Sequence, residues 1–222
     1  MPIKSWGGAK YILFLTDDYS RKSWVYLLQE KNQVMSRFID FKNLLEKHTG
    51  ANIKCLRTDG GGEYCNDRFK CFLKSQGIIH QITVPYCPQQ NGVSERLNRT
   101  LLEKARCMLQ ESGLIQEYWG KAIMTVLYLK NGSPTVALAG LMPEQVWIGS
   151  DIDLSHLRVF GCIAYALIPE QKRSKLDPKS KKYIFVGYSD STKVYRLRDL
   201  QNARRFFYAT YVTFLELFEG HG

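Results

Sequence analysis

The order of the apolar segments constrains the fold of this chain more than any other sequence feature. Two strand-like runs, Tyr11–Asp17 and Ser23–Gln29, are joined by the polar turn sequence DDYSRK. Continuous apolar runs of this length predict buried strands, and a polar turn between two of them predicts a hairpin. Helical and strand-like segments then alternate up to residue 112. A hairpin followed by this alternation predicts an α/β fold in which helices flank a mixed sheet.

The alternating segments carry local start and stop signals. Residues 31–50 place Val34, Phe38, Phe41 and Leu45 at helical spacing, and Gly50 is a candidate C-cap. We expect strands at 52–58 and 78–84, helices at 66–77 (with Asn66 as N-cap), 93–112 and 117–132, and a loop at 85–92.

The pattern changes between residues 149 and 155. After this point the chain contains only short strand-like runs separated by turn residues, at 159–168, 181–189, 193–199 and 204–216. Such a series predicts a small all-β domain. We therefore expect two domains, 1–150 with the α/β pattern and 151–222 as a small basic β-barrel.

The charge is strongly basic and unevenly distributed. The formal net charge is +10, and residues 157–208 contain twelve Lys or Arg against four Asp or Glu. A basic region within a folded pattern indicates a polyanionic partner, although solvated surface charge is an equally good interpretation of this feature alone.

The cysteines and apolar runs exclude other classes of protein. None of the six cysteines lies in a CxxC pair and the four histidines are scattered, so we expect reduced thiols in an intracellular compartment and no zinc site. No apolar run reaches the roughly 18 residues of a membrane helix, and no membrane association is expected.

Two carboxylates stand out. Asp59 ends a strand-like run and precedes three glycines, and Glu95 begins the 93–112 helix after 35 intervening residues. Taken singly, Asp59 is more typical of a turn cap and Glu95 of a favourable first-turn charge. As a pair, they are the oxygen ligands that Mg²⁺ prefers, and the glycines would let a phosphate backbone approach closely. Metal-assisted phosphoryl transfer on nucleic acid uses such groups.

A resemblance to a known family covers nearly the whole chain. The motifs RTDGGGEY and TVPYCPQQNGVSERLNRTLLEKARCML resemble the integrase catalytic core of copia-type long-terminal-repeat retrotransposons. The resemblance continues through YLKNGSP, MPEQVWIG and LSHLRVFGCIAYALIP. The motifs KLDPKSKKYIFVGYS and KVYRLRD resemble the small Src-homology-3-type barrel that follows this core.

The resemblance implies a ribonuclease-H-like fold and a metal-binding triad of two Asp and one Glu. In the family, the triad binds two Mg²⁺ or Mn²⁺ ions. Water attacks the element's DNA ends, and the freed 3′-hydroxyl then attacks target DNA. By motif match, Asp59 is the second acid and Glu95 the third.

The same match implies the nucleic-acid contacts. Gln89, Gln90 and Asn91 fall in the mobile loop beside the active site, and Arg96 and Arg99 are candidate phosphate contacts. Lys104 is interpreted as a solvated surface charge. The family also implies DNA as partner, a homo-oligomer and action in the nucleus, with KSKK at 179–182 as a weak localisation signal.

Departures from the family pattern affect the expected activity. The first acid lies in a His-x-Asp-x-x-Gly-Pro pattern that would precede Met1, so the chain is expected to be truncated and to lack the first strand. Asp17 and Asp18 match the following DDYSR turn rather than the metal ligand. Gly60 stands where the family usually has Asn, and Gly132 where it often has Arg. We therefore expect impaired integration.

Other functions remain open at this point. The chain would alternatively be a non-catalytic nucleic-acid-binding module or an inactive retroelement relic. A ribonuclease-H-type nuclease shares the expected fold, but the PQQNGVSER segment favours an integrase.

Overall fold

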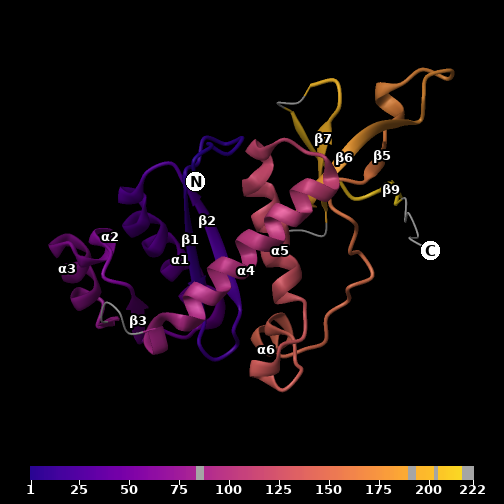
Figure 1. Cartoon of the computed structure of the whole chain (residues 1–222). Coiled ribbons are helices and arrows are strands. Elements are labelled where there is room, and N and C mark those ends of the chain that lie inside the picture. The colour runs from indigo at the N-terminus through magenta and orange to yellow at the C-terminus, as the bar shows by residue number, and fades with distance from the viewer. Residues whose placement is uncertain (84–87, 190–193, 203–204, 217–222) are drawn as a thin grey trace. The chain divides into compact units, whose positions relative to one another are not determined.

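The computed structural model describes residues 1–83, 88–189, 194–202 and 205–216 (Figure 1). The chain forms two compact units. The first contains Met1–Leu15 and Trp24–Thr100, and the second contains Thr16–Ser23 and Leu101–Gly222. Because the two units are not placed relative to one another, each is described by itself.

The first unit is built around one long amphipathic helix. The strands β1 (Tyr11–Thr16) and β2 (Ser23–Leu28) pair, and η1 (Lys31–Gln33) leads into α1 (Val34–Thr49). The α1 side chains Phe38 and Phe41 are buried against side chains of both strands. Gly50 ends α1 at φ +68°, and its N–H bonds to the Glu46 carbonyl, as its C-cap role predicts. The predicted hairpin and helix are confirmed.

A second, parallel pair of strands completes this unit. The strand β3 (Cys55–Thr58) pairs with β4 (Ile79–Ile82) in a register that joins Cys55 to Ile79 and Thr58 to Ile82. Between them lie α2 (Gly62–Cys65) and α3 (Asp67–Ser75). Asn66 caps α3, because its side-chain oxygen accepts the Phe69 N–H at 2.9 Å. Phe69 and Leu73 of α3 are fully buried in the same core as α1.

The expected mixed sheet is present in this unit as two separate two-stranded sheets. In the described part of the chain, β1 pairs only with β2, and β3 only with β4. Each pair therefore has strand edges that no described strand covers. The side chains of both pairs nevertheless share one core, since Leu15, Trp24 and Leu56 all pack against it.

The long helix α4 (Pro88–Ser112) begins five residues before the predicted start at Val93. The prediction of a loop over residues 88–92 is therefore wrong. Proline suits the first helical position, since its fixed φ matches the helix and its missing N–H would have no partner there. Residues 84–87 of the predicted loop lie outside the described residues. Leu101 and Ala105, one turn apart on α4, are buried.

The second unit joins helices, among them α4 from Leu101 onward, to a five-stranded sheet. Its helical part contains η2 (Gln116–Tyr118), α5 (Trp119–Asn131), η3 (Val136–Leu138) and α6 (Pro143–Ile148). The turn 16–23 belongs to this unit because Asn131 bonds Ser23 at both its N–H (3.1 Å) and its carbonyl (2.8 Å). Lys22 also pairs with Glu144 at 2.7 Å.

The sheet has the strand order β8-β7-β6-β5-β9 and is antiparallel throughout. Its strands are β5 (Ile163–Leu167), β6 (Ser180–Tyr188), β7 (Tyr195–Asp199), β8 (Phe206–Ala209) and β9 (Val212–Leu215). The predicted final run 204–216 is therefore two strands. Only Thr210 and Tyr211 separate β8 from β9, although these strands occupy opposite edges of the sheet. Such a short connection requires the sheet to roll up, which gives it a barrel-like form.

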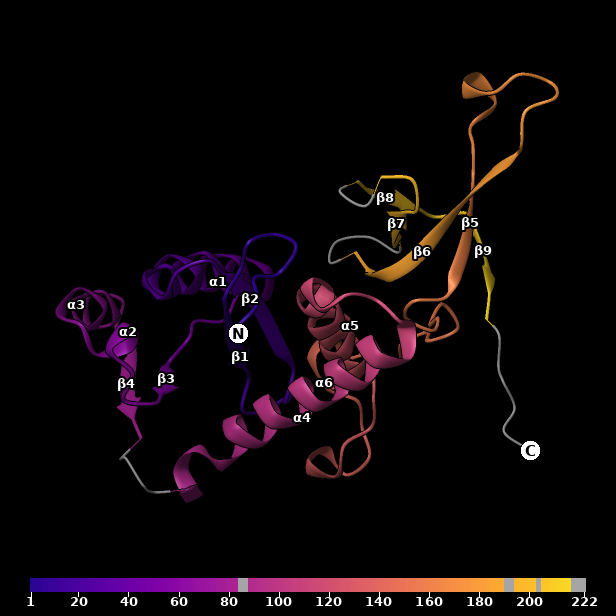
Figure 2. The ribbon, with the colours of Figure 1, turned by 45° about the horizontal axis from the view of Figure 1, so that its top comes forward.

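The connection between β5 and β6 contains η4 (Glu170–Lys172) and projects beyond the other strands (Figure 2). One face of the rolled sheet encloses Phe185, Leu197 and Ala164, all fully buried.

Two glycines allow the helices of this unit to approach the sheet closely. Gly187, at φ +127°, lies so near α5 that an added Cβ would meet the Thr125 hydroxyl at 2.7 Å. Gly161, at φ +86°, faces Ser112 of α4, where an added Cβ would lie 2.2 Å from the serine Cβ. Both positions therefore exclude side chains on conformational and steric grounds.

The predicted domain boundary at residue 150 stays a prediction. The compact units group α5 and α6 with the sheet, because α5 packs directly on β6. Among the described helices, none has the length and apolar character needed to cross a membrane.

Candidate metal and nucleic-acid site

Asp59 lies directly after β3, at the carboxyl end of the strand, and its side chain is exposed. The preceding Thr58 is buried and anchors the strand end. Its carbonyl accepts the Thr83 N–H at 2.9 Å, and its hydroxyl lies 2.9 Å from His80 Nε2. Burial lowers the pKa of His80, and the charge of Lys70 lowers it further. The strand end is therefore held rigidly while the carboxylate itself reaches solvent.

The glycine loop after Asp59 is compact. Asp59 Oδ1 accepts the Gly61 N–H at 3.2 Å. A Cβ added at Gly61 would lie 3.0 Å from that same oxygen and 3.0 Å from Glu63 Cδ. A side chain at position 61 would therefore fit only if one of these two carboxylates shifted slightly. The glycine keeps this loop open on the side where the carboxylates lie.

Glu63 is the site residue that sequence reasoning missed. It lies in the same RTDGGGEY segment as Asp59, but only the folded loop shows that both carboxylates lie close to Gly61. Burial, followed by the charges of Asp59 and Glu63, raises the pKa of Tyr64 to about 12. Tyr64 is therefore a neutral hydroxyl beside two negative charges. Like charges held this close favour a bound cation.

Glu95 is exposed on α4, in the part of the helix that belongs to the first unit. Arg96 and Arg99 are exposed on the same part of α4, as phosphate contacts require. Gln89, Gln90 and Asn91 lie in the first turns of α4 rather than in a loop, and their side chains lie outside the described residues. Lys104 is exposed, in agreement with its interpretation as a surface charge.

No three His, Cys, Asp or Glu side chains converge as a metal site in the described ranges. Asp59 and Glu95 are the two acids that the sequence motifs predict as metal ligands. Glu63 is an additional carboxylate beside Asp59. The assignment of Asp59 and Glu95 as metal ligands stays a prediction.

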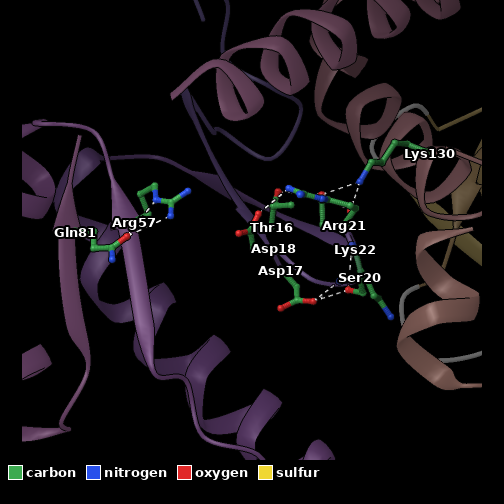
Figure 3. A network of polar contacts seen from close by, with 10 residues as sticks. Thr16, Asp17, Asp18, Ser20, Arg21, Lys22, Arg57, Gln81 and Lys130 are labelled. Carbon is green, nitrogen blue, oxygen red and sulfur yellow. Dashed lines mark hydrogen bonds and ion pairs between the residues drawn. The ribbon is translucent and has the colours of Figure 1, made fainter. Parts of the chain in front are cut away.

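Asp17 and Asp18 are engaged in the hairpin turn (Figure 3). Asp17 Oδ2 accepts both the N–H and the hydroxyl of Ser20 at 2.7 Å, and Asp18 pairs with Arg21 at 2.6 Å. Lys130 donates to the Arg21 carbonyl and, at 2.9 Å, to the Ser23 hydroxyl. These contacts agree with the interpretation of both acids as turn residues.

Part of the basic charge of the five-stranded sheet has an internal role. Arg196 is buried, and its Nε donates to the Tyr208 hydroxyl at 3.0 Å. Arg198 lies 5.0 Å over the ring of Tyr118. The cationic excess of residues 157–208 therefore overstates the charge available to a polyanion, because such arginines stabilise the packing of the sheet.

Comparisons with known proteins agree with this arrangement. Residues 1–88 match the integrase core domain, and residues 162–221 match the retroviral polymerase SH3-like domain. Asp59 lies inside the first match, and Glu95 lies beyond its end.

Relatives of this chain include polyproteins of plant transposons. The chain is 49% identical over 199 residues to the retrovirus-related Pol polyprotein from transposon TNT 1-94 of Nicotiana tabacum. The aligned region covers 90% of this chain and 15% of that protein. It is 34% identical over 203 residues to the Pol polyprotein from transposon RE1 of Arabidopsis thaliana, covering 91% of this chain and 14% of that protein. The chain thus spans a small part of the length of these relatives.

A solved structure shares the fold. The match is a chain of the cryo-EM structure of a simian T-cell lymphotropic virus intasome in complex with PP2A regulatory subunit B56 gamma, and it covers 93% of this chain and 72% of that chain. The TM-score is 0.50 at 15% sequence identity. The two sequence matches define a retroviral-type integrase core followed by an SH3-like domain. The chain belongs to the copia-type retrotransposon integrases, whose fold is ribonuclease-H-like in the core.

Proposed function

We propose that this chain acts on DNA as the core and barrel of an integrase, in metal-dependent 3′-end processing and strand transfer. The observation that carries the proposal is the exposed carboxylate of Asp59 at the end of β3, beside a glycine loop in which the Asp59 and Glu63 carboxylates both lie close to Gly61. A strand end presents an acid rigidly, and glycines leave room for a phosphate backbone.

The residues that would hold Mg²⁺ or Mn²⁺ are Asp59 and Glu95. Their hard carboxylate oxygens suit these ions, and the exposure of Asp59 leaves space for water and substrate phosphate in the remaining positions. A divalent ion at this site would supply charge stabilisation and an activated nucleophile for phosphoryl transfer. Gly61 orients Asp59 through its N–H, and Tyr64, which packs against the core of this unit, stays neutral.

The DNA contacts proposed here come from α4. Arg96 and Arg99 would contact phosphates, which position the strand without reading its sequence. Gln89, Gln90 and Asn91 would contact the DNA near the reacting phosphodiester. A homo-oligomer, DNA ends and target DNA as partners, and action in the nucleus are proposed from family membership alone.

This chain is expected to join DNA weakly, since no group of three side chains able to hold a metal ion is found among its described residues, and too few ligands weaken metal positioning. Strand transfer of labelled, pre-processed donor ends with Mg²⁺ or Mn²⁺ measures this. Robust joining that is lost in Glu95→Ala would refute impaired activity and establish catalysis.

Metal binding has a separate readout. Titration calorimetry with Mn²⁺ should detect weak binding to the wild-type chain and at least a tenfold loss in Asp59→Asn, because a coordinating charge is removed. Asp18→Asn is the matched control, since Asp18 is already paired with Arg21. An equal loss in both variants would refute Asp59 as a ligand.

A non-catalytic nucleic-acid-binding module is the second candidate. The exposed cations of the connection between β5 and β6, which include Lys175 and Lys179, favour it. Binding would then weaken steeply with salt and survive Asp59→Asn. Salt-independent binding would contradict this function, and the absence of a cooperative thermal transition would favour an inactive relic.

A further inference from the structure

A cavity in the first unit opens beside the Asp59 loop and has no role in the proposed chemistry. It measures about 530 Å³ and lies between the start of α1 and the α2–α3 connection. Its walls include Lys31, Met35, Ile39, Glu63 and Arg68. This volume falls in the range of sites that enclose a small ligand.

The two cations that line the cavity make few or weak contacts with other side chains. Arg68 is exposed and makes no hydrogen bond or ion pair to another described residue. Lys31 is exposed, and its Nζ lies 3.9 Å from Glu63 Oε1 and 5.8 Å from the centre of the Tyr11 ring. An ion pair this long and exposed contributes little, so Lys31 can exchange it for a better anion. The two cations outnumber the single carboxylate, and the cavity therefore favours a negative ligand.

Two neutral polar side chains in the wall already make hydrogen bonds to nearby groups. Asn66 caps α3 through its oxygen, and its Nδ2 donates to the Glu63 carbonyl at 2.9 Å. Ser36 donates to the Gln33 carbonyl at 2.9 Å. These bonds make the wall rigid and leave Arg68 and Lys31 as the groups available for recognition.

The apolar part of the wall defines the rest of the ligand. Met35 and Ile39 lie one helical turn apart on α1, and both are half-buried. A methionine thioether makes favourable contacts with aromatic rings. The cavity thus combines an apolar wall with two cations, which suits an aromatic ring that carries a phosphate.

We propose that this cavity binds one unstacked nucleotide of a single DNA strand, with its phosphate at Arg68 and Lys31 and its base against Met35 and Ile39. The proposal rests on the proposed function of the neighbouring Asp59 site, and it adds a preference for single-stranded DNA. A base inside a duplex is stacked and paired, so it cannot enter the cavity without the cost of unstacking.

The experiment is fluorescence anisotropy with the full chain and a fluorescein-labelled oligothymidine of about twelve nucleotides, compared with a duplex of equal length. The wild-type chain should bind the single strand more tightly than the duplex. Arg68→Gln should weaken single-strand binding about tenfold and reduce the slope of log K against log salt by about 0.7. Met35→Ala should weaken single-strand binding with an unchanged salt slope, because it removes only a base contact.

Lys74→Gln is the matched control. Lys74 lies on α3 with Arg68 and is exposed, but it does not line the cavity. Equal losses in Arg68→Gln and Lys74→Gln would overturn the proposal, as would equal binding of both DNA forms or stronger competition by an acidic peptide than by unlabelled oligothymidine. Circular dichroism melting of each variant excludes loss of the fold.

The two proposals fail separately. Asp59→Asn should leave the single-strand preference unchanged if the cavity binds the nucleotide. Absence of metal binding at Asp59 with retained sensitivity to Arg68→Gln would refute the metal site and keep the cavity.

Discussion

The two units of this protein complete their cores in different ways. In the first unit, α1 and α3 bury phenylalanines against two separate strand pairs, and each pair has edges that no described strand covers. In the second unit, five strands pair continuously and roll around Phe185 and Leu197, with α5 against β6. The candidate site and the cavity therefore belong to the unit in which fewer strands pair with one another. In that unit, the packing of helices positions the functional groups.

The largest expected losses of stability come from removing one large buried side chain from each core in turn. Phe69 and Phe185 are both fully buried, one in each unit. Replacing either with alanine should cost about 3–5 kcal/mol in the free energy of unfolding, because a large cavity is left. Hydrogen exchange measured by mass spectrometry should show the loss of protection in the first unit for Phe69→Ala and in the second unit for Phe185→Ala. Loss across both units in either variant would mean that they unfold as one body.

A smaller loss of stability should show how far the first unit depends on the capping of its helices. Asn66→Ala removes the N-cap of α3 and should cost about 1 kcal/mol. Urea denaturation of the variant measures this loss, and Asn52→Ala provides a control at an exposed asparagine outside any helix or strand. A change in stability no larger than that of the control would show that packing of Phe69 and Leu73 alone holds α3.

The smallest effect concerns the acid sensitivity of the first unit. Glu46 accepts a hydrogen bond from Lys42 at 2.8 Å and from the Ile53 N–H at 3.0 Å, and these contacts lower the pKa of Glu46, the Lys42 bond most. Because the folded pKa lies below the unfolded value, the contribution of Glu46 to stability is present above the unfolded pKa near 4.5 and is lost as the pH falls through the folded pKa.

Thermal melting of the wild-type chain between neutral and acid pH measures this contribution. Glu46→Gln should flatten the acid limb of the melting temperature, whereas Asp40→Asn, at an exposed acid on the same helix, should leave its slope unchanged. An acid limb that is identical in the wild type and Glu46→Gln would contradict the assigned cause.

The sequence by itself determined the order of the elements, the caps at Gly50 and Asn66, and the turn role of Asp17 and Asp18. These features depend on residues close together in the chain, whose spacing and side-chain chemistry are local. The family motifs also identified Asp59 and Glu95 as candidate ligands, an assignment that stays a prediction.

Only the tertiary structure decided the features that depend on space between distant segments. The sequence did not predict that α4 starts at Pro88, that the last run divides into two edge strands, or that Glu63 lies beside Asp59. The cavity between α1 and the α2–α3 connection likewise exists only because both segments pack on one core. Periodicity records which faces are apolar, but the folded chain decides which faces meet, since packing joins residues that local spacing cannot relate.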